Sequence, residues 1–335
     1  MDREEKIVQP KIASREVTTH ILKAFGLHMS KKLGQNFLID AGIVQGIVDA
    51  ADIQPGERVL EIGPGIGTLT QALAMTGASV VSVELDKRLI PVLKETVGAY
   101  ENVRIVQGDI LKVDILKVVE ETRALCENAK RSDRIVATEN AAQEFADDAA
   151  LTTAGSAACS VNNNNSTAPF KVCANLPYYI TTPIIMYLLE QKLPLERLVV
   201  MVQKEVAERM IAKPGGRDYG AISVAMQYYT EPKIAFVVKA GSFLPAPKVD
   251  SAVLVCKRRT IPPVDVPDEK IFFKVVAAAF SVRRKMLTNS LKNMGGLTGE
   301  QVKAWLDRAG IDGTRRAETL SLEEFAALAR TWEKN

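Results

Sequence analysis

Residues 58–74, RVLEIGPGIGTLTQALA, contain the pattern on which the fold and the first functional inference depend. An apolar run is followed by three glycines at alternate positions, Gly63, Gly65 and Gly67, and then by residues with helical spacing. This order is typical of a strand, a tight turn and a helix, where backbone groups can approach a ligand. A dinucleotide fingerprint has its third glycine where this chain has Thr68, so the spacing here is GxGxG. By itself, such a turn is equally typical of a purely structural connection.

Strand-like and helix-like segments alternate along the chain on both sides of this stretch. Their order predicts an α/β fold with a parallel sheet, helices on both faces, and an antiparallel edge formed by the last two strands. We expect strands at residues 58–62, 79–83, 103–107, 171–174, 197–202, 233–239 and 251–257, and helices at residues 42–51, 68–75, 88–97 and 204–211.

Composition changes twice along the chain and suggests its division. Residues 127–168 are rich in alanine and include four consecutive asparagines, so we expect a mobile surface insertion with a helix near residues 138–151. After residue 260 the apolar spacing becomes helical throughout. We therefore expect an N-terminal extension (1–29), a sheet domain (30–260) and a small helical C-terminal domain (261–335).

Composition also excludes several kinds of site. The chain of 335 residues is 47% hydrophobic and 25% charged, begins with an acidic segment and has no apolar run long enough for a membrane span, so we expect a cytoplasmic protein. Four dispersed cysteines without a CxxC pair argue against a metal site or a disulfide framework. The only histidines, His20 and His28, precede the first expected helix, which disfavours nucleophilic chemistry that depends on histidine.

Two acidic residues follow the next two expected strands. Glu84 ends the segment VVSVELD, and Asp109 follows the third strand in VQGDI. A carboxylate at the first position can accept hydrogen bonds from both hydroxyls of a ribose, and one at the second can meet an adenine amino group. Each acid alone is commonly a solvated charge or a helix cap, but the succession of glycine turn, Glu and Asp favours a cofactor that contains adenosine.

The fourth strand ends in 171-KVCANLPYYITTP-183, which has no acid, base or metal ligand at its end. Asn175 Oδ1 and a backbone carbonyl beside Pro177 can accept hydrogen bonds from an exocyclic NH₂ group, while Tyr178 stacks on a ring. Accepting both hydrogens favours a pyramidal, nucleophilic amine, so alkylation by a sulfonium needs no strong base. The alternative is an ordinary turn with half-buried aromatic residues. Tyr179 to Pro183 then begin a helix, with Thr181 or Thr182 as its cap.

Taken together, these segments resemble the KsgA/RsmA family of ribosomal RNA adenine dimethyltransferases. The resemblance covers roughly residues 18–126 and 169–335. It rests on 30-SKKLGQNFLID-40, EIGPGIGTLT, VELD, GDIL, NLPYYITTPI, 203-QKEVAERMIAKPGGRDYGAISV-224, 243-FLPAPKVDSAV-253 and 280-FSVRRKMLTNSL-291. The chain departs from the family in the long connection between Asp109 and Asn175, which we expect to loop away from the site.

This resemblance implies a Rossmann-like class I methyltransferase sheet with S-adenosylmethionine as the methyl donor. The substrate would be two adjacent adenosines in the 3′-terminal hairpin loop of small-subunit rRNA, within immature 30S particles. Apart from the resemblance, we expect a monomer and no metal. The residues implied for the cofactor are Asn36, Leu38, Gly63, Gly65, Glu84, Asp109 and Asn175. Those implied for the target base are Asn175, Leu176, Pro177 and Tyr178, with Phe243 stacking on the opposite face.

Basic residues provide weaker indications of RNA contacts. The net charge is +3, and residues 257–335 carry fifteen Lys or Arg against ten Asp or Glu. Such residues would contact phosphates without reading sequence, although all could equally be solvated surface charges. The candidates are Lys31, Lys32, Lys213, Arg217, Arg283, Arg284 and Lys285.

Three other functions are consistent with parts of the sequence. An Erm-type enzyme would methylate a large-subunit adenosine, and the segments FLPAPKVDSAV and FSVRRKMLTNSL favour the small-subunit enzyme instead. A nicotinamide dehydrogenase is disfavoured by Thr68. A non-catalytic factor for small-subunit assembly would tolerate the loss of Asn175, and the sequence does not rank this role against catalysis.

Overall fold

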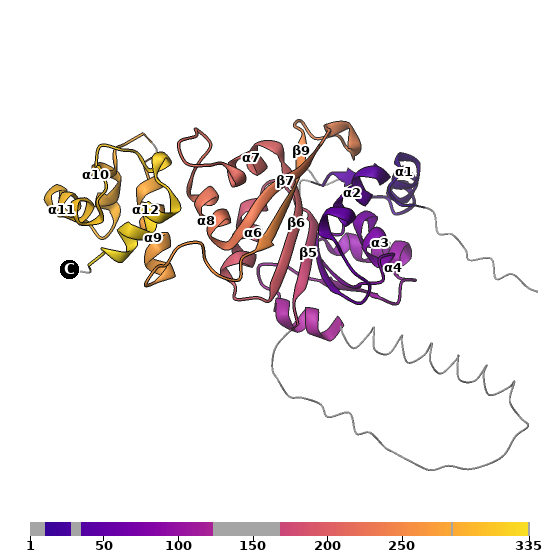
Figure 1. Cartoon of the computed structure of the whole chain (residues 1–335). Coiled ribbons are helices and arrows are strands. Elements are labelled where there is room, and N and C mark those ends of the chain that lie inside the picture. Colours follow the sequence, from indigo (N-terminus) through magenta and orange to yellow (C-terminus); the bar gives the residue numbers. More distant parts are fainter. Residues whose placement is uncertain (1–10, 28–34, 123–167, 283, 334–335) are drawn as a thin grey trace, which may run out of the picture.

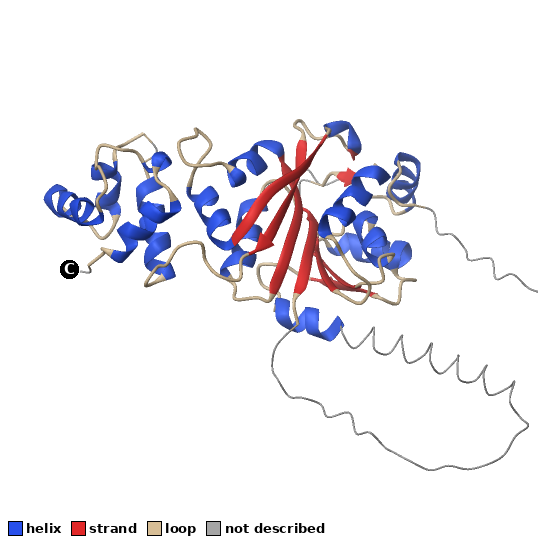
Figure 2. Ribbon diagram, viewed as in Figure 1, coloured by secondary structure: helices blue, strands red, loops and turns tan. Residues whose placement is uncertain are grey.

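The computed structural model describes residues 11–27, 35–122, 168–282 and 284–333, and its centre is a mixed sheet of seven strands (Figures 1 and 2). The strand order is β4-β3-β2-β5-β6-β9-β7. The first five strands in this order are parallel, and β9 and then β7 continue the sheet as antiparallel strands. The strands are β2 (Arg58–Ile62), β3 (Ser79–Glu84), β4 (Val103–Gln107), β5 (Phe170–Asn175), β6 (Leu195–Gln203), β7 (Thr230–Val238) and β9 (Ser251–Arg258). The predicted parallel sheet with an antiparallel edge is confirmed.

Both faces of the sheet are buried at its inner strands, as expected for parallel strands covered by helices, whereas the edge strands β4 and β7 are partly exposed. In β5, Val172 and Ala174 belong to one apolar cluster, whereas Cys173 belongs to the cluster on the opposite face. Figure 1 shows α2 and α3 on one side of the sheet and α7 and α8 on the other. The helices of this region are α2 (Ala41–Ala51), α3 (Thr68–Ala74), α4 (Ile90–Val97), α6 (Thr181–Glu190), α7 (Lys204–Ile211) and α8 (Ala221–Tyr229), and residues 115–122 are also helical.

The N-terminal segment contains a helix, α1 (Arg15–Ala24), that the sequence did not predict. Ile12, Ile21 and Leu22 are buried in a cluster with residues of α4, so this part of the chain is anchored to the fold. The Ile12 backbone N–H also donates to Gln71 Oε1 of α3 at 3.0 Å. Local signals for α1 were present in the sequence, because Ser14 caps the helix by accepting from the Val17 backbone N–H, and Glu16 lies in its first turn.

A two-stranded ribbon and four C-terminal helices complete the described structure. The ribbon pairs β1 (Phe37–Leu38) with β8 (Phe243–Leu244) in antiparallel fashion. The helices lie beyond α8 in Figure 1 and are α9 (Glu269–Phe280), α10 (Leu287–Ser290), α11 (Gly299–Ala309) and α12 (Leu322–Arg330). Each of the last two helices, α11 and α12, begins with a capping box.

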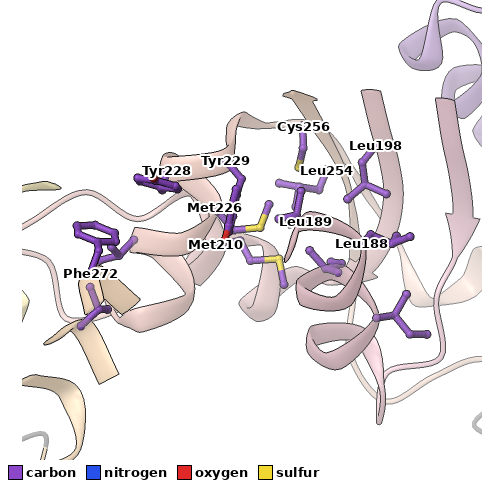
Figure 3. Packing of buried hydrophobic residues seen from close by; sticks show 14 of the residues in the cluster. Leu188, Leu189, Leu198, Met210, Met226, Tyr228, Tyr229, Leu254, Cys256 and Phe272 are labelled. Carbon is purple, nitrogen blue, oxygen red and sulfur yellow. The ribbon is translucent and has the colours of Figure 1, made fainter. Parts of the chain in front are cut away.

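The apolar core runs without interruption from the sheet into the C-terminal helices. Figure 3 shows Leu254 of β9 and Tyr228 of α8 in the same region as Phe272 of α9. The Tyr228 and Phe272 rings stack with centroids 5.0 Å apart. The boundary expected after residue 260 therefore stays a prediction, as do the limits of the other expected domains. The expected insertion (127–168) and its helix near residues 138–151 lie outside the described residues, apart from Ala168.

Two negative findings apply to the described segments. None of their helices is long and apolar enough to cross a membrane. They also contain no group of three or more His, Cys, Asp or Glu side chains placed to hold a metal ion.

Candidate active site

The carboxyl ends of β2, β3, β4 and β5 border a crevice of about 1160 Å³, part of it open to solvent. The chain places β3 and β4 on one side of β2 and then returns to place β5 on the other side. Ligands of open α/β sheets bind at such a switch point. The crevice brings together residues that the sequence placed in one site, namely Asn36, Leu38, Gly63, Gly65, Glu84, Asp109, Asn175, Leu176, Pro177 and Tyr178.

Glycine is needed in the β2–α3 turn for structural reasons that differ from one position to another. All three have positive φ, at +69° for Gly63, +63° for Gly65 and +90° for Gly67. Residues with a Cβ atom rarely adopt this backbone conformation. A Cβ on Gly67 would lie 2.8 Å from Val97 Cγ1, so this glycine permits close packing of α3 against α4. A Cβ on Gly63 would meet no atom within 4 Å. Gly63 thus leaves open space beside the crevice where a ligand can approach the backbone.

The two predicted acids lie at the ends of adjacent strands. Glu84 is 6% exposed, and its carboxylate accepts hydrogen bonds from the backbone N–H groups of Gly65, at 3.2 Å, and Asp86, at 2.7 Å. Burial raises the pKa of Glu84 despite these two bonds. Asp109 is more exposed and accepts a bond from the Leu111 backbone N–H at 3.1 Å. The side chains are therefore held in place at the edge of the crevice by the backbone.

Contacts from distant segments orient the end of β5. Asn175 Nδ2 donates to the carbonyl oxygen of Asn36 at 3.2 Å, which leaves Oδ1 as the acceptor of this amide. The hydroxyl of Tyr178 and Ser251 Oγ are 2.7 Å apart. Ser251 is the first residue of β9 and was not singled out from the sequence. The two contacts fix the amide and the aromatic ring that were predicted to hold a flat amine.

The turn after Asn175 identifies which carbonyl beside the proline can accept a further bond. Pro177 O already accepts from the Ile180 backbone N–H, at 3.2 Å, and from Thr181 Oγ1, at 3.0 Å. The geometry therefore favours the carbonyl of Leu176. The predicted capping role of Thr181 or Thr182 is wrong, because α6 begins at Thr181 itself and Ile180 occupies the cap position without a side-chain bond.

Glu61, the penultimate residue of β2, is a crevice residue that sequence reasoning missed. Its side chain is 1% exposed, and its Oε2 accepts hydrogen bonds from Thr70 Oγ1 and Ser82 Oγ, both at 2.6 Å. Burial raises its pKa to about 7, and nearby Glu84 adds to the effect. An acid inside an otherwise apolar strand was a readable signal, since Glu is almost never buried without a partner or a function.

Thr68, the first residue of α3, also lines the crevice. It is 7% exposed, and its Oγ1 has no hydrogen-bond partner within the described ranges. Buried hydroxyls normally have one. An unsatisfied polar atom in the wall of a crevice is consistent with a polar ligand.

Comparison with known proteins identifies the group of enzymes to which this site belongs. The family model of ribosomal RNA adenine dimethylases matches residues 26–334. The chain belongs to this family. A relative of this adenine dimethylase, ribosomal RNA small subunit methyltransferase A of Geobacillus thermodenitrificans (strain NG80-2), is 45% identical over 321 residues, which cover 95% of this chain and 96% of the relative.

Two solved structures are similar to this adenine dimethylase. A dimethyladenosine transferase from Plasmodium falciparum has a TM-score of 0.62 and 22% identity, covering 87% of this chain and 95% of that one, and supports the fold alone. The 23S rRNA methyltransferase ErmE has a TM-score of 0.57 and 25% identity, covering 88% of this chain and 99% of that one. The predicted class I methyltransferase fold is thus confirmed, and the dehydrogenase alternative is excluded by the family.

S-adenosylmethionine is the methyl donor of the adenine dimethylase, and the observed crevice fits it. Open space beside Gly63 allows a ligand to contact the backbone, and the hydroxyl of Thr68 offers an unused donor. Glu61 and Glu84 offer carboxylates to the cationic and hydroxyl groups of such a ligand. These features suit an extended, partly cationic molecule.

Phe243, expected to stack on the target base, does not line the crevice. Its side chain is 1% exposed and belongs to a core cluster with Val238, because the β1–β8 ribbon places Phe243 opposite Leu38. Contact with a base would require this side chain to leave the core. Phe243 thus lies in the core beside the ribbon and outside the crevice, and its stacking role stays a prediction.

Four of the residues predicted to contact RNA are exposed and belong to two neighbouring loops. Lys213 and Arg217 lie in the loop after α7, and Arg284 and Lys285 lie in the turn after α9. Both loops attach to residues 315–318, through a bond from Gly215 N to Glu318 O at 2.7 Å and one from Leu287 N to Arg315 O at 2.9 Å. The three other candidates, Lys31, Lys32 and Arg283, lie outside the described residues.

Proposed function

We propose that this adenine dimethylase transfers methyl groups to N6 of two adjacent adenosines in the 3′-terminal hairpin loop of small-subunit rRNA. Each adenosine would become N6,N6-dimethyladenosine, in immature 30S particles in the cytoplasm, with the enzyme acting as a monomer. The observation that carries the proposal is the fixed group of Asn175, Leu176 and Tyr178 at the end of β5, beside the crevice for the methyl donor. The name of the relative in Geobacillus thermodenitrificans supports the small subunit as the target.

The order of the strand ends supports one orientation of the cofactor. Asp109 at β4 would accept from the adenine amino group, and Glu84 at β3 would accept from the ribose hydroxyls. The methionine moiety would then reach the end of β2 near Gly63, where the buried carboxylate of Glu61 can pair with its ammonium group. Asn36 and Leu38 would cover the cofactor from the segment before α2.

The target adenine would enter at the end of β5, next to the methionine end. Asn175 Oδ1 and the carbonyl of Leu176 would accept the two hydrogens of its N6 amine, and Tyr178 would stack on its ring. Bound S-adenosylmethionine supplies an electrophilic methyl group on a sulfonium. The chain's own contribution is positioning, since accepting both hydrogens favours a pyramidal amine whose lone pair faces the methyl. After transfer the nitrogen is cationic and loses its proton readily, so no strong base is required.

The exposed basic loops, whose residues do not line the crevice, support an RNA-binding surface. Lys213 and Arg217 on one loop and Arg284 and Lys285 on the other share an attachment to residues 315–318, which keeps their charges in one region. Contacts with phosphates would position a folded rRNA and make binding depend on salt. Lys31, Lys32 and Arg283 belong to the same proposal on their sequence alone.

Transfer of labelled methyl groups to unmethylated 30S subunits, 50S subunits and free rRNA, followed by nucleoside analysis, tests the substrate. We expect N6,N6-dimethyladenosine on small-subunit rRNA in 30S particles. Label on 50S subunits alone would instead favour the Erm-type alternative, for which the likeness to ErmE is the supporting observation. Monomethyladenosine as the sole product would contradict the dimethylation proposed here.

The variant Asn175→Ala separates a catalytic role from the alternative of a non-catalytic assembly factor. This variant removes the proposed acceptor for the amine and leaves the basic loops unchanged. We expect it to lose methyl transfer. Normal maturation of small subunits with this variant would show that assembly does not depend on catalysis, and impaired maturation would show that it does.

A further inference from the structure

Thr68 has the clearest unexplained polar group in the wall of the crevice. Its side chain is nine-tenths buried, and among the described residues no partner is found for its Oγ1. Thr70, two residues along α3, is also buried, yet its hydroxyl donates to Glu61 Oε2 at 2.6 Å. Because burying a hydroxyl without a partner is costly, and because Thr68 lines the crevice, its Oγ1 is a candidate hydrogen-bond donor to a ligand bound there.

The proposed placement of the cofactor, on which this inference rests, determines which part of it reaches Thr68. With adenine at β4 and ribose at β3, the methionine moiety lies at the end of β2, where α3 begins. This moiety has one ammonium group and one carboxylate group. We propose that Thr68 Oγ1 donates a hydrogen bond to the α-carboxylate of S-adenosylmethionine and is a cofactor-binding residue.

The other polar groups of this part of the crevice support the pairing. Glu61 and Glu84 both line the crevice and are carboxylates, so neither can receive the carboxylate of the ligand. Glu61 suits the ammonium group, because opposite charges attract strongly where water is excluded. A hydroxyl is a donor that rotates to meet an acceptor. Thr68 therefore complements Glu61, and the two side chains distinguish the two charged groups of the methionine moiety.

Two substitutions and two ligands test the contact directly. Thr68→Val keeps the branched shape and removes the hydroxyl, and Thr68→Ser keeps the hydroxyl. Binding of S-adenosylmethionine and of decarboxylated S-adenosylmethionine to the full chain is measured by calorimetry. We expect Thr68→Val to weaken the binding of S-adenosylmethionine by about tenfold or more, as for the loss of a hydrogen bond to a charged group. The affinity for the decarboxylated ligand should change little. Thr68→Ser should bind both ligands nearly as the unsubstituted chain does.

Equal losses for the two ligands with Thr68→Val, or no loss for either, would overturn the assignment to the carboxylate. If the unsubstituted chain bound neither ligand, the proposed cofactor placement would fail before this inference was tested. The two failures are therefore distinguishable.

Urea unfolding without ligand provides an independent measurement. If Thr68 Oγ1 has no partner in the free protein, Thr68→Val should be at least as stable as the unsubstituted chain. Thr70→Val is the matched control on the same helix, and it should be less stable because it removes a donor from buried Glu61. Equal destabilisation by the two substitutions would show that Thr68 has a protein partner, and would contradict the proposal.

Discussion

Replacing Glu61 by Gln should make the protein more stable without its cofactor, and increasingly so as pH rises. The carboxylate is buried, and burial raises its pKa from 4.5 to about 7. Below pH 4.5 the group is protonated in both the folded and the unfolded state, so it does not change stability. Between these two pKa values the unfolded chain loses its proton while the folded chain keeps it, and the free energy of unfolding therefore falls as pH rises.

The size of the effect follows from the two pKa values. Each pH unit between 4.5 and 7 costs about 1.4 kcal/mol, so the ionised group destabilises the folded chain by roughly 3 kcal/mol above pH 7. Gln stays neutral, and its oxygen can accept the bonds from Thr70 and Ser82 that Glu61 Oε2 accepts. The advantage of Glu61→Gln should grow from about 1 kcal/mol near pH 5.5 to roughly 3 kcal/mol near pH 8.

Urea unfolding of both proteins without S-adenosylmethionine, at several pH values, measures this difference. A fixed cost of burying the Gln amide would shift every value equally, so the dependence of the difference on pH is the test. A difference that stays constant from pH 5.5 to pH 8 would refute the assignment of the raised pKa to Glu61.

The same reasoning makes a prediction for the bound state. If Glu61 pairs with the ammonium group of the cofactor, the complex favours the ionised carboxylate. Below about pH 7 the free protein holds a proton on Glu61, and binding of the cofactor releases it. Affinity for S-adenosylmethionine should then increase as pH rises towards 8 in the unsubstituted chain and stay nearly constant in Glu61→Gln. Identical pH profiles for the two proteins would contradict the pairing.

Three further predictions concern the base, the glycine turn and the RNA surface. Ser251→Ala removes the hydrogen-bond partner of Tyr178 and should lower the rate of methyl transfer about fivefold, as expected for one neutral hydrogen bond. The affinity for the cofactor, measured by calorimetry, should not change. Equal losses in the rate and in the affinity would argue against a role at the base. Gly67→Ala should lower the free energy of unfolding in urea by about 2 kcal/mol or more, because φ is +90° and the added Cβ meets a valine of α4; a neutral change would contradict the packing role. Lys213→Ala and Lys285→Ala should each reduce the slope of log affinity for RNA against log salt by about 1, and unchanged slopes would remove these residues from the RNA surface.

The central sheet was predictable because its strands are continuous apolar segments between clear turns. The bounds of β2 and β4 agree with the sequence prediction, and β9 differs by a single residue. The β1–β8 ribbon was not predictable in the same way. Each of its strands has two residues, and they pair across about 200 positions of the chain, so no local pattern indicates them. Helix α8 was missed as well, because AISVAMQYY contains β-branched and aromatic residues with little helical preference, and its helical form depends on tertiary packing.

In the candidate site, too, some residues could be predicted from the local sequence and others depend on contacts with distant segments. Glu84 and Asp109 could be predicted because each follows a recognisable strand, and parallel strands end at a common edge. The position of Phe243 could not be predicted. A strand of two residues is too short for its sequence to show which side chain faces the core. Thr68 was read from the sequence as a departure from the dinucleotide fingerprint. Its unused hydroxyl became visible once the burial and the partners of the surrounding side chains were known.

The contact between Asn175 and Asn36 shows why the methyl donor and the acceptor can be positioned together. Asn36 lies in the segment that covers the crevice before α2, and Asn175 ends the strand that is proposed to hold the base. The bond from Asn175 Nδ2 to Asn36 O joins these segments across 139 positions of the sequence. Because the same amide would present Oδ1 to the amine, a shift of the covering segment would also turn the acceptor. In the proposed placement, the orientation of the base is therefore linked through one side chain to the segment that lines the cofactor site before α2.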